Sequence, residues 1–178
     1  MEQFVQNIHH ELIERCRTGE REAFYKLYKL YSKAMYNVSF RITHDEAEAE
    51  DVLQESFISA FNNLERYRGD APFGAWLKRI VVNKAINNLN KRKTEPLPEN
   101  EDWDIAEDEP VYYAPDGFTV ERVKKAIDQL PDGYRTVLNL YLLEGYDHQE
   151  IGEIMNITES TSKSQLNRAK NKLRELLR

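Results

Sequence analysis

The sequence predicts an all-α protein of two small helical domains, four helices in each, joined by a flexible acidic linker. Glycine and proline are scarce, at 7 and 6 of 178 residues, so few positions interrupt a helix. Apolar residues recur every three or four positions over most of the chain, which is the spacing of one helix face. That spacing disappears at residues 94–119, where four prolines stand among acids. We therefore expect an N-terminal domain at 1–93, a linker at 94–119 and a C-terminal domain at 120–178.

The first three helices of the N-terminal domain are expected at about residues 8–18, 21–42 and 45–64. Gly19 ends the first of them. Asp45 is a good N-cap for the third, and Glu48 stands three residues on, as in a capping box.

The fourth helix follows a polar loop at residues 67–71 and begins near Pro72, a residue that suits a first helical turn. Its inward stripe includes Phe73 and Trp76, and we expect Trp76 to lie in the core. Its other face combines asparagines with bases, namely Lys78, Arg79, Asn83, Lys84, Asn87, Asn88, Lys91 and Arg92. Such a face could hold phosphates and reach a base edge, but a solvated basic face is the commoner meaning of this pattern.

Residues 147–170 predict a helix-turn-helix. Two helices are expected before the helix-turn-helix, at about 120–129 and 134–143, and Gly145 ends the second of them. Asp147 caps a short helix that ends near Met155, and Asn156 tolerates the left-handed backbone of a tight turn. Thr158 then caps a long last helix. Polar and basic side chains near the start of this helix suit base edges and phosphates in a major groove: Thr161, Lys163, Ser164, Asn167, Arg168 and Lys170. A helical packing module with a solvated basic face remains the alternative.

Charge is distributed unevenly along the chain. The net charge of −6 alone argues mildly against nucleic-acid binding. Residues 66–93, however, hold eight bases and one acid, and residues 158–178 hold six bases and two acids, whereas residues 94–121 hold ten acids and no base. These two basic blocks coincide with the fourth and the last helix and predict two DNA-facing surfaces.

The third helix carries an acidic outer face at Asp51, Gln54 and Glu55. Acids in the first turn favour the helix dipole, but these three residues lie further along. No partner histidine, nucleophile motif or Gly-rich phosphate loop accompanies them, so general acid–base chemistry is disfavoured. A docking face for a basic protein partner is the better interpretation.

Several other kinds of site are disfavoured. No apolar run is long enough to span a membrane, and residues 1–16 lack a signal pattern, so we expect a cytoplasmic protein without membrane insertion. The single cysteine, Cys16, cannot form an internal disulfide, and the four histidines lack zinc-ligand spacing. We expect no metal, no other cofactor and no enzymatic activity.

Residues 47–93 resemble the second conserved region of bacterial sigma factors, and residues 127–173 resemble the fourth. Residues 23–31 also fit the start of the second region. Only the short acidic linker lies between, which resembles the extracytoplasmic-function group. The resemblance implies a factor that binds core RNA polymerase and directs promoter-specific initiation.

The resemblance also implies roles for individual residues. Asp51, Gln54 and Glu55 would bind the polymerase clamp. The loop at residues 67–71 and the following helix would capture and melt the minus-ten element, through Tyr67, Arg68, Lys78, Arg79, Asn83 and Lys84. The last helix would read the minus-thirty-five element of promoter DNA through the six side chains that suit a major groove. The fourth region would also dock on the polymerase flap, and an anti-sigma factor is a further expected partner.

The chain departs from many relatives at Ser162, Gln165 and Asn167 in the last helix, and at Asn87. A different promoter preference is therefore expected. Two other functions remain open at this point. A stand-alone helix-turn-helix regulator with an N-terminal sensor domain would explain only the C-terminal half. A metal-dependent enzyme acting on nucleic acid would have to use the clustered carboxylates.

Overall fold

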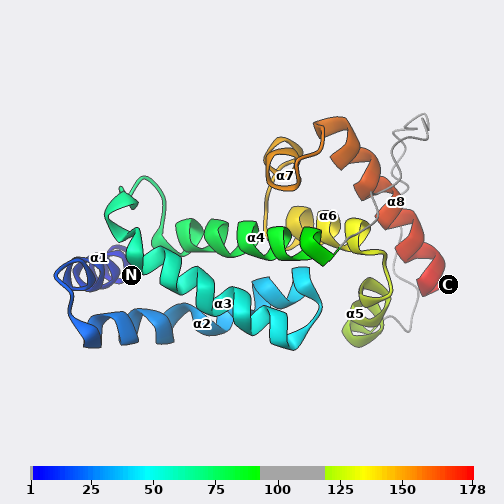
Figure 1. Cartoon of the computed structure of the whole chain (residues 1–178). Helices are drawn as coiled ribbons and strands as arrows, with labels where there is room; N and C mark the ends of the chain where they lie inside the picture. The colour runs from blue at the N-terminus through cyan, green and yellow to red at the C-terminus, as the bar shows by residue number, and fades with distance from the viewer. Residues whose placement is uncertain (1, 93–118) are drawn as a thin grey trace. The chain divides into compact units, whose positions relative to one another are not determined.

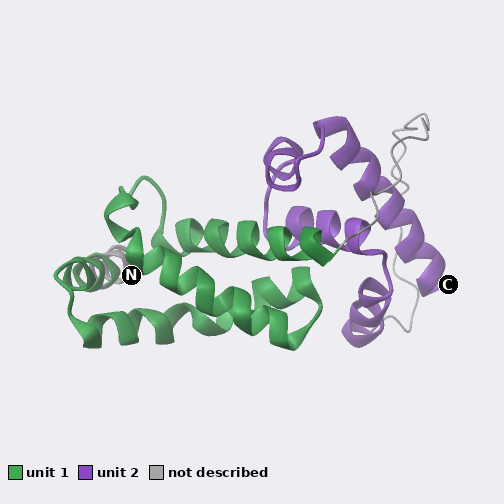
Figure 2. Cartoon of the chain, in the orientation of Figure 1, with its two compact units in different colours: residues 1–92 green, residues 93–178 purple. Residues whose placement is uncertain are grey.

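The computed structural model describes residues 2–92 and 119–178, with side chains from His9 onward in the first helix, and these residues form α-helices and one short 3-10 helix (Figure 1). The chain divides into two compact units, residues 1–92 and 93–178 (Figure 2). Almost all of the expected linker lies outside the described residues. Helical structure throughout the described parts confirms the predicted all-α class.

The N-terminal unit consists of α1 (Glu2–Arg17), α2 (Arg21–Thr43), α3 (Glu46–Asn62), the 3-10 helix η1 (Leu64–Arg66) and α4 (Phe73–Arg92). Helices α2, α3 and α4 pack against one another, and α1 packs against α2 and η1. The side chains at their centre are completely or almost completely buried: Leu27, Ile42, Leu77, Val81 and Val82. Burial of this apolar surface supplies most of the stabilisation of the unit.

Two boundaries in this unit differ from expectation. Helix α1 begins at Glu2 rather than near residue 8, because no glycine or proline interrupts the intervening residues. Pro72 stands just before α4, and its carbonyl accepts hydrogen bonds from the N–H groups of Ala75 and Trp76. The predicted cap of α3 is confirmed, since the Asp45 carboxylate accepts from the Glu48 N–H at 2.9 Å.

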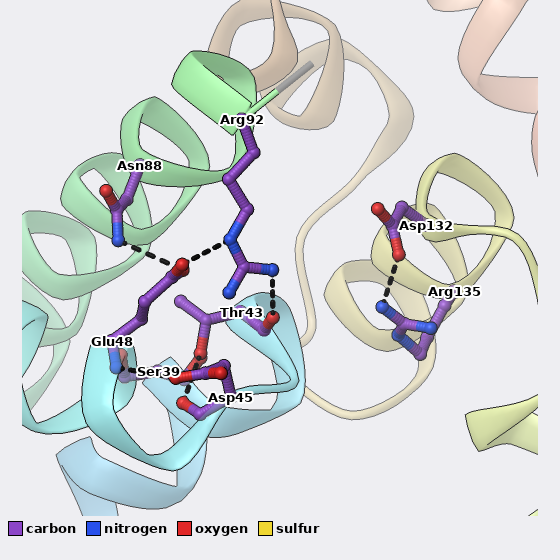
Figure 3. Close-up of polar contacts among 8 residues, drawn as sticks. All are labelled: Ser39, Thr43, Asp45, Glu48, Asn88, Arg92, Asp132 and Arg135. Carbon is purple, nitrogen blue, oxygen red and sulfur yellow. Dashed lines mark hydrogen bonds and ion pairs between the residues drawn. The ribbon is translucent and has the colours of Figure 1, made fainter.

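The C-terminal unit consists of α5 (Val120–Asp128), α6 (Asp132–Leu142), α7 (His148–Met155) and α8 (Glu159–Leu177). Helix α8 packs against all three of the others. The fully buried centre of the C-terminal unit includes Leu138 and Leu140 of α6 and Ile151 of α7. The buried guanidinium of Arg135 donates to the Asp132 carboxylate at 2.6 Å (Figure 3). It also donates to the Leu130 carbonyl at 3.0 Å, and the two bonds stabilise the turn before α6. No described helix has the length and apolar character that crossing a bilayer requires.

Candidate nucleic-acid interface

Helices α7 and α8 form the predicted helix-turn-helix. Asp147 and Glu150 make a complete capping box at the start of α7, with reciprocal bonds of 2.8 and 2.9 Å. Asn156 adopts the left-handed conformation expected of it, at φ 55° and ψ 48°, and so ends α7. The Thr158 hydroxyl accepts from the Thr161 N–H at 3.0 Å and starts α8. Local hydrogen bonds therefore define both ends of the turn.

Gly152 allows α7 and the start of α8 to approach closely. A Cβ atom placed on Gly152 would lie 2.8 Å from the carbonyl oxygen of Ile157, which is closer than a carbon and an oxygen normally come. The Ile157 N–H in turn donates to the Gly152 carbonyl at 3.0 Å. The absence of a side chain at this position sets the separation of the two helices.

The DNA-facing residues predicted on α8 form two neighbouring rows at three- and four-residue spacing. Lys163, Asn167 and Lys170 make one row, and Thr161, Ser164 and Arg168 make the other. Lys163 and Asn167 are exposed, and the other four are half-buried. The opposite face of the helix is buried and contains Ser162, Leu166 and Ala169. The two rows thus present polar and basic side chains on the side of α8 away from its buried face.

Some of these side chains also have partners within the unit. The Thr161 hydroxyl bonds the Thr158 hydroxyl at 2.8 Å, and the Ser164 hydroxyl donates to the Thr161 carbonyl at 2.9 Å. Lys163 pairs with Glu159 at 2.7 Å, but both side chains are about half exposed, so the pair contributes little and is easily exchanged for another anion.

The structure corrects one expectation about α8. Ser162 is completely buried, and its hydroxyl bonds His148 Nδ1 at 2.9 Å, so it lies in the core rather than toward DNA. Gln165 is half-buried, and only Asn167 of the three divergent positions is exposed. Any change in base preference from those three positions therefore comes from Asn167 or Gln165 rather than from Ser162.

In the N-terminal unit, the polar loop before α4 is held by its own hydrogen bonds. The Tyr67 hydroxyl donates to the Ala71 carbonyl at 2.7 Å, and Arg17 donates to the Tyr67 carbonyl at 2.6 Å. The Tyr67 ring lies 5.4 Å from the rings of both Phe73 and Trp76. Trp76 is half-buried in this aromatic group rather than in the core, which corrects its predicted position.

The loop forms one wall of a pocket of about 400 Å³, and α1 and α2 contribute His9, His10, Ile13 and Tyr31. The Tyr31 hydroxyl and His9 Nδ1 share a hydrogen bond of 2.8 Å. Burial raises the pKa of both Tyr31 and Tyr67, so their hydroxyls stay protonated and remain able to donate. Sequence reasoning missed the contribution of α1, because no pattern in residues 8–18 points to this loop.

On α4, Asn83 is exposed, as predicted, and Lys78, Arg79 and Lys84 are half-buried. Two side chains of the expected outward face, Asn88 and Arg92, also have partners within the unit; Asn88 is half-buried, and Arg92 is exposed. The Asn88 amide donates to the Glu48 carboxylate at 3.2 Å, and the Arg92 guanidinium bonds the same carboxylate and the Thr43 carbonyl, the latter at 3.1 Å (Figure 3). These bonds fasten the end of α4 to the turn between α2 and α3.

The three predicted docking residues, Asp51, Gln54 and Glu55, are all exposed on one face of α3. Their spacing places them on adjacent turns. Glu55 lies 3.8 Å from Lys84 of α4. Asp51, Glu55, Lys84 and Lys91 line one hollow of about 200 Å³ between the two helices. The acidic surface of α3 and the basic surface of α4 are therefore neighbours.

Comparison with known proteins explains why these surfaces occur together. Residues 27–95 match the family model for sigma-70 region 2, and residues 121–173 match that for sigma-70 region 4. The RNA polymerase sigma-H factor of Pseudomonas aeruginosa is 33% identical over 90% of this chain and 89% of its own length. The ECF RNA polymerase sigma factor SigW of Bacillus subtilis is 31% identical over 93% of this chain and 95% of its own length.

The chain belongs to the ECF group of RNA polymerase sigma factors. It directs promoter recognition by RNA polymerase and is not an enzyme. All fifteen side chains predicted to bind polymerase or DNA fall inside the two matched regions of this sigma factor. Helix α1, which lines the pocket beside the loop, precedes the region 2 match.

Two solved structures share the fold of this sigma factor. One is the sigma factor RpoE of Bartonella quintana in complex with the anti-sigma factor NepR, with a TM-score of 0.56, 22% identity and coverage of 86% of this chain and 96% of that one. The other is CnrH in complex with the cytosolic domain of CnrY, with a TM-score of 0.53, 22% identity and coverage of 93% and 94%.

Proposed function

We propose that this ECF sigma factor divides promoter recognition between its two units. The C-terminal unit reads duplex DNA at the minus-thirty-five element, and the N-terminal unit binds the minus-ten element and stabilises the separated strands. The observation that carries the proposal is the capped helix-turn-helix, whose α8 turns two polar and basic rows outward. Bases at such positions hold phosphates, and amide and hydroxyl groups read base edges.

Each predicted set of side chains has a task in this scheme. On the minus-thirty-five duplex the contacts come from Thr161, Lys163, Ser164, Asn167, Arg168 and Lys170. At the minus-ten element they come from Tyr67, Arg68, Lys78, Arg79, Asn83 and Lys84. The pocket bounded by Tyr67 and Phe73 has aromatic walls against which an unstacked base can lie.

Core polymerase completes the assembly. Asp51, Gln54 and Glu55 form an exposed acidic surface that suits a basic helix of the clamp. The C-terminal unit docks on the flap. The net charge of −6 keeps the free factor from binding random DNA tightly, so we expect weak binding to promoter DNA without polymerase and tight binding with it. The factor acts in the cytoplasm.

An anti-sigma factor is a further proposed partner. The structurally similar RpoE of Bartonella quintana is itself held by an anti-sigma factor. A protein that covers the surfaces of α3 or α8 would prevent the chain from engaging polymerase or promoter.

In vitro transcription with core polymerase over a promoter library tests the scheme as a whole. Lys163→Ala and Arg168→Ala should each weaken holoenzyme binding and lower the slope of log affinity against log salt by about 1. Lys124→Ala removes the same charge from exposed α5 and should leave that slope unchanged. A library without any transcript that depends on this chain would refute the scheme.

Two further variants separate docking from opening. Asp51→Ala and Glu55→Ala should lower affinity for core polymerase without unfolding the chain, whereas Glu65→Ala, an acid of η1, should not. Asn83→Ala should reduce strand opening, measured by permanganate reactivity, more than duplex binding. Normal polymerase affinity in the α3 variants would contradict the docking assignment, and equal losses with Asn83→Ala would contradict a role in melting.

A further inference from the structure

We propose that His148 is a further DNA-binding residue of this sigma factor, which together with Lys163 and Lys170 holds a backbone phosphate beside the minus-thirty-five groove and takes up a proton when the duplex binds. This inference rests on the proposed function, because it requires α8 to lie in the major groove.

The position of the His148 ring is determined by contacts with two other helices. The ring stacks on Tyr141 of α6, with centroids 4.6 Å apart and planes inclined by 18°. Its Nδ1 bonds the hydroxyl of Ser162, a completely buried residue of α8, at 2.9 Å. These contacts hold the ring against the recognition helix at the start of α7.

The same geometry leaves the other ring nitrogen available. Nδ1 and Nε2 lie on opposite edges of an imidazole, so a ring whose Nδ1 points at a buried hydroxyl turns Nε2 away from the core. His148 is half-buried, and within the described parts of the chain its Nε2 has no hydrogen-bond partner. One nitrogen therefore anchors the ring, and the other can donate to a ligand.

The electrostatic surroundings of the ring suit an anion. Burial is the main cause that lowers the pKa of His148, and Lys163 and Lys170 of α8 lower it further, while Glu159 and Asp147 oppose them. On the α6 side, the ring of Tyr141 stacks on His148 and contributes no carboxylate. The free protein thus holds a neutral imidazole next to two ammonium groups, and both lysines belong to the row on α8 that the proposed function directs to DNA.

A phosphate bound at this position has the opposite effect on the pKa of His148. Its negative charge offsets the two lysines and stabilises the imidazolium, so the pKa of His148 is higher in the complex than in the free protein. Because the complex binds the proton more tightly, the affinity for DNA increases as the pH falls toward the pKa of His148 in the free protein. This gain in affinity is lost as the pH rises through the pKa of His148 in the complex. We expect this linkage to change the affinity for DNA by about threefold to tenfold.

The test measures binding of holoenzyme to a duplex that carries the minus-thirty-five element, at constant ionic strength, between about pH 5.5 and 8. His148→Asn retains a polar group that can reach Ser162 but cannot titrate in this range. We expect the affinity of wild type to fall by about threefold to tenfold more than that of His148→Asn across the range. At the acidic end, the variant should also show a salt slope lower by about 1.

Two controls separate a DNA contact from a structural role. Ser162→Ala removes the anchoring bond but retains the imidazole, so it should lower affinity and preserve the pH dependence. His44→Asn changes an exposed histidine of the N-terminal unit and should retain the wild-type profile. Identical pH profiles for wild type and His148→Asn would overturn the inference. If wild-type holoenzyme did not distinguish the element from a scrambled duplex, the proposed function itself would fail, and that result is recognisable in the wild-type arm alone.

Discussion

Gly152 is the position at which a single added methyl group tests the geometry of the helix-turn-helix. A Cβ there would lie 2.8 Å from the Ile157 carbonyl oxygen and 3.6 Å from the Glu159 nitrogen, so the backbone of the turn must move by a few tenths of an ångström. Overpacking of this kind costs about 1–3 kcal/mol. Replacing a helical glycine by alanine regains about 1 kcal/mol. We therefore expect Gly152→Ala to lose between about 0 and 2 kcal/mol of unfolding free energy.

Gly152→Val should be clearly worse, because it adds two more methyl groups at the same contact and regains less helix propensity. We expect a loss of about 2–3 kcal/mol. Urea unfolding followed by circular dichroism measures both variants, and Gln149→Val, on the exposed face of the same helix, controls for the branched side chain. Minus-thirty-five binding should weaken in the same order. A Gly152→Val protein as stable as Gly152→Ala would refute the close approach of the two helices.

Three further predictions concern the N-terminal unit. Arg92→Met removes the bonds to the Glu48 carboxylate and to the Thr43 carbonyl. Because both charged side chains are partly exposed, we expect the free energy of unfolding, measured by thermal unfolding, to fall by about 1 kcal/mol. An unchanged unfolding transition would show that these bonds contribute nothing. Burial raises the pKa of the Cys16 thiol to about 11, so a thiol reagent at pH 8 should modify it only as fast as the unit unfolds. The unfolded chain releases this proton at lower pH than the folded one, so the free energy of unfolding should fall as pH rises from about 9 to 11. Immediate labelling of the native protein would contradict the burial.

The features that the sequence predicted well depend on neighbours in the chain. The cap at Asp45, the capping box at Asp147 and the left-handed turn at Asn156 each involve residues no more than a few positions apart. Their chemistry acts before any tertiary contact forms, so a pattern of residue types is enough to indicate them. The two basic surfaces were predictable for a similar reason, because helical periodicity converts spacing into a face.

The features that were missed depend on contacts between distant residues. Arg92 looked like one more phosphate ligand, but it bonds Glu48, 44 positions away. Ser162 is one of the three divergent positions expected to alter promoter preference, but it bonds His148 across the helix-turn-helix. In both cases composition and spacing indicate a polar side chain without indicating its partner, and only the packing of helices decides whether that partner is solvent, DNA or protein.

The burial of one face of α8 has a practical consequence for redesign. Leu166 and Ala169 belong to the packing of the unit, so a larger or polar replacement there would destabilise the fold rather than change the promoter preference. Freedom to vary is confined to outward positions such as Lys163 and Asn167. Variants of this factor that each recognise a different synthetic promoter can therefore be sought by varying a few outward codons. That number is small enough for every combination to be screened while the rest of the chain stays unchanged.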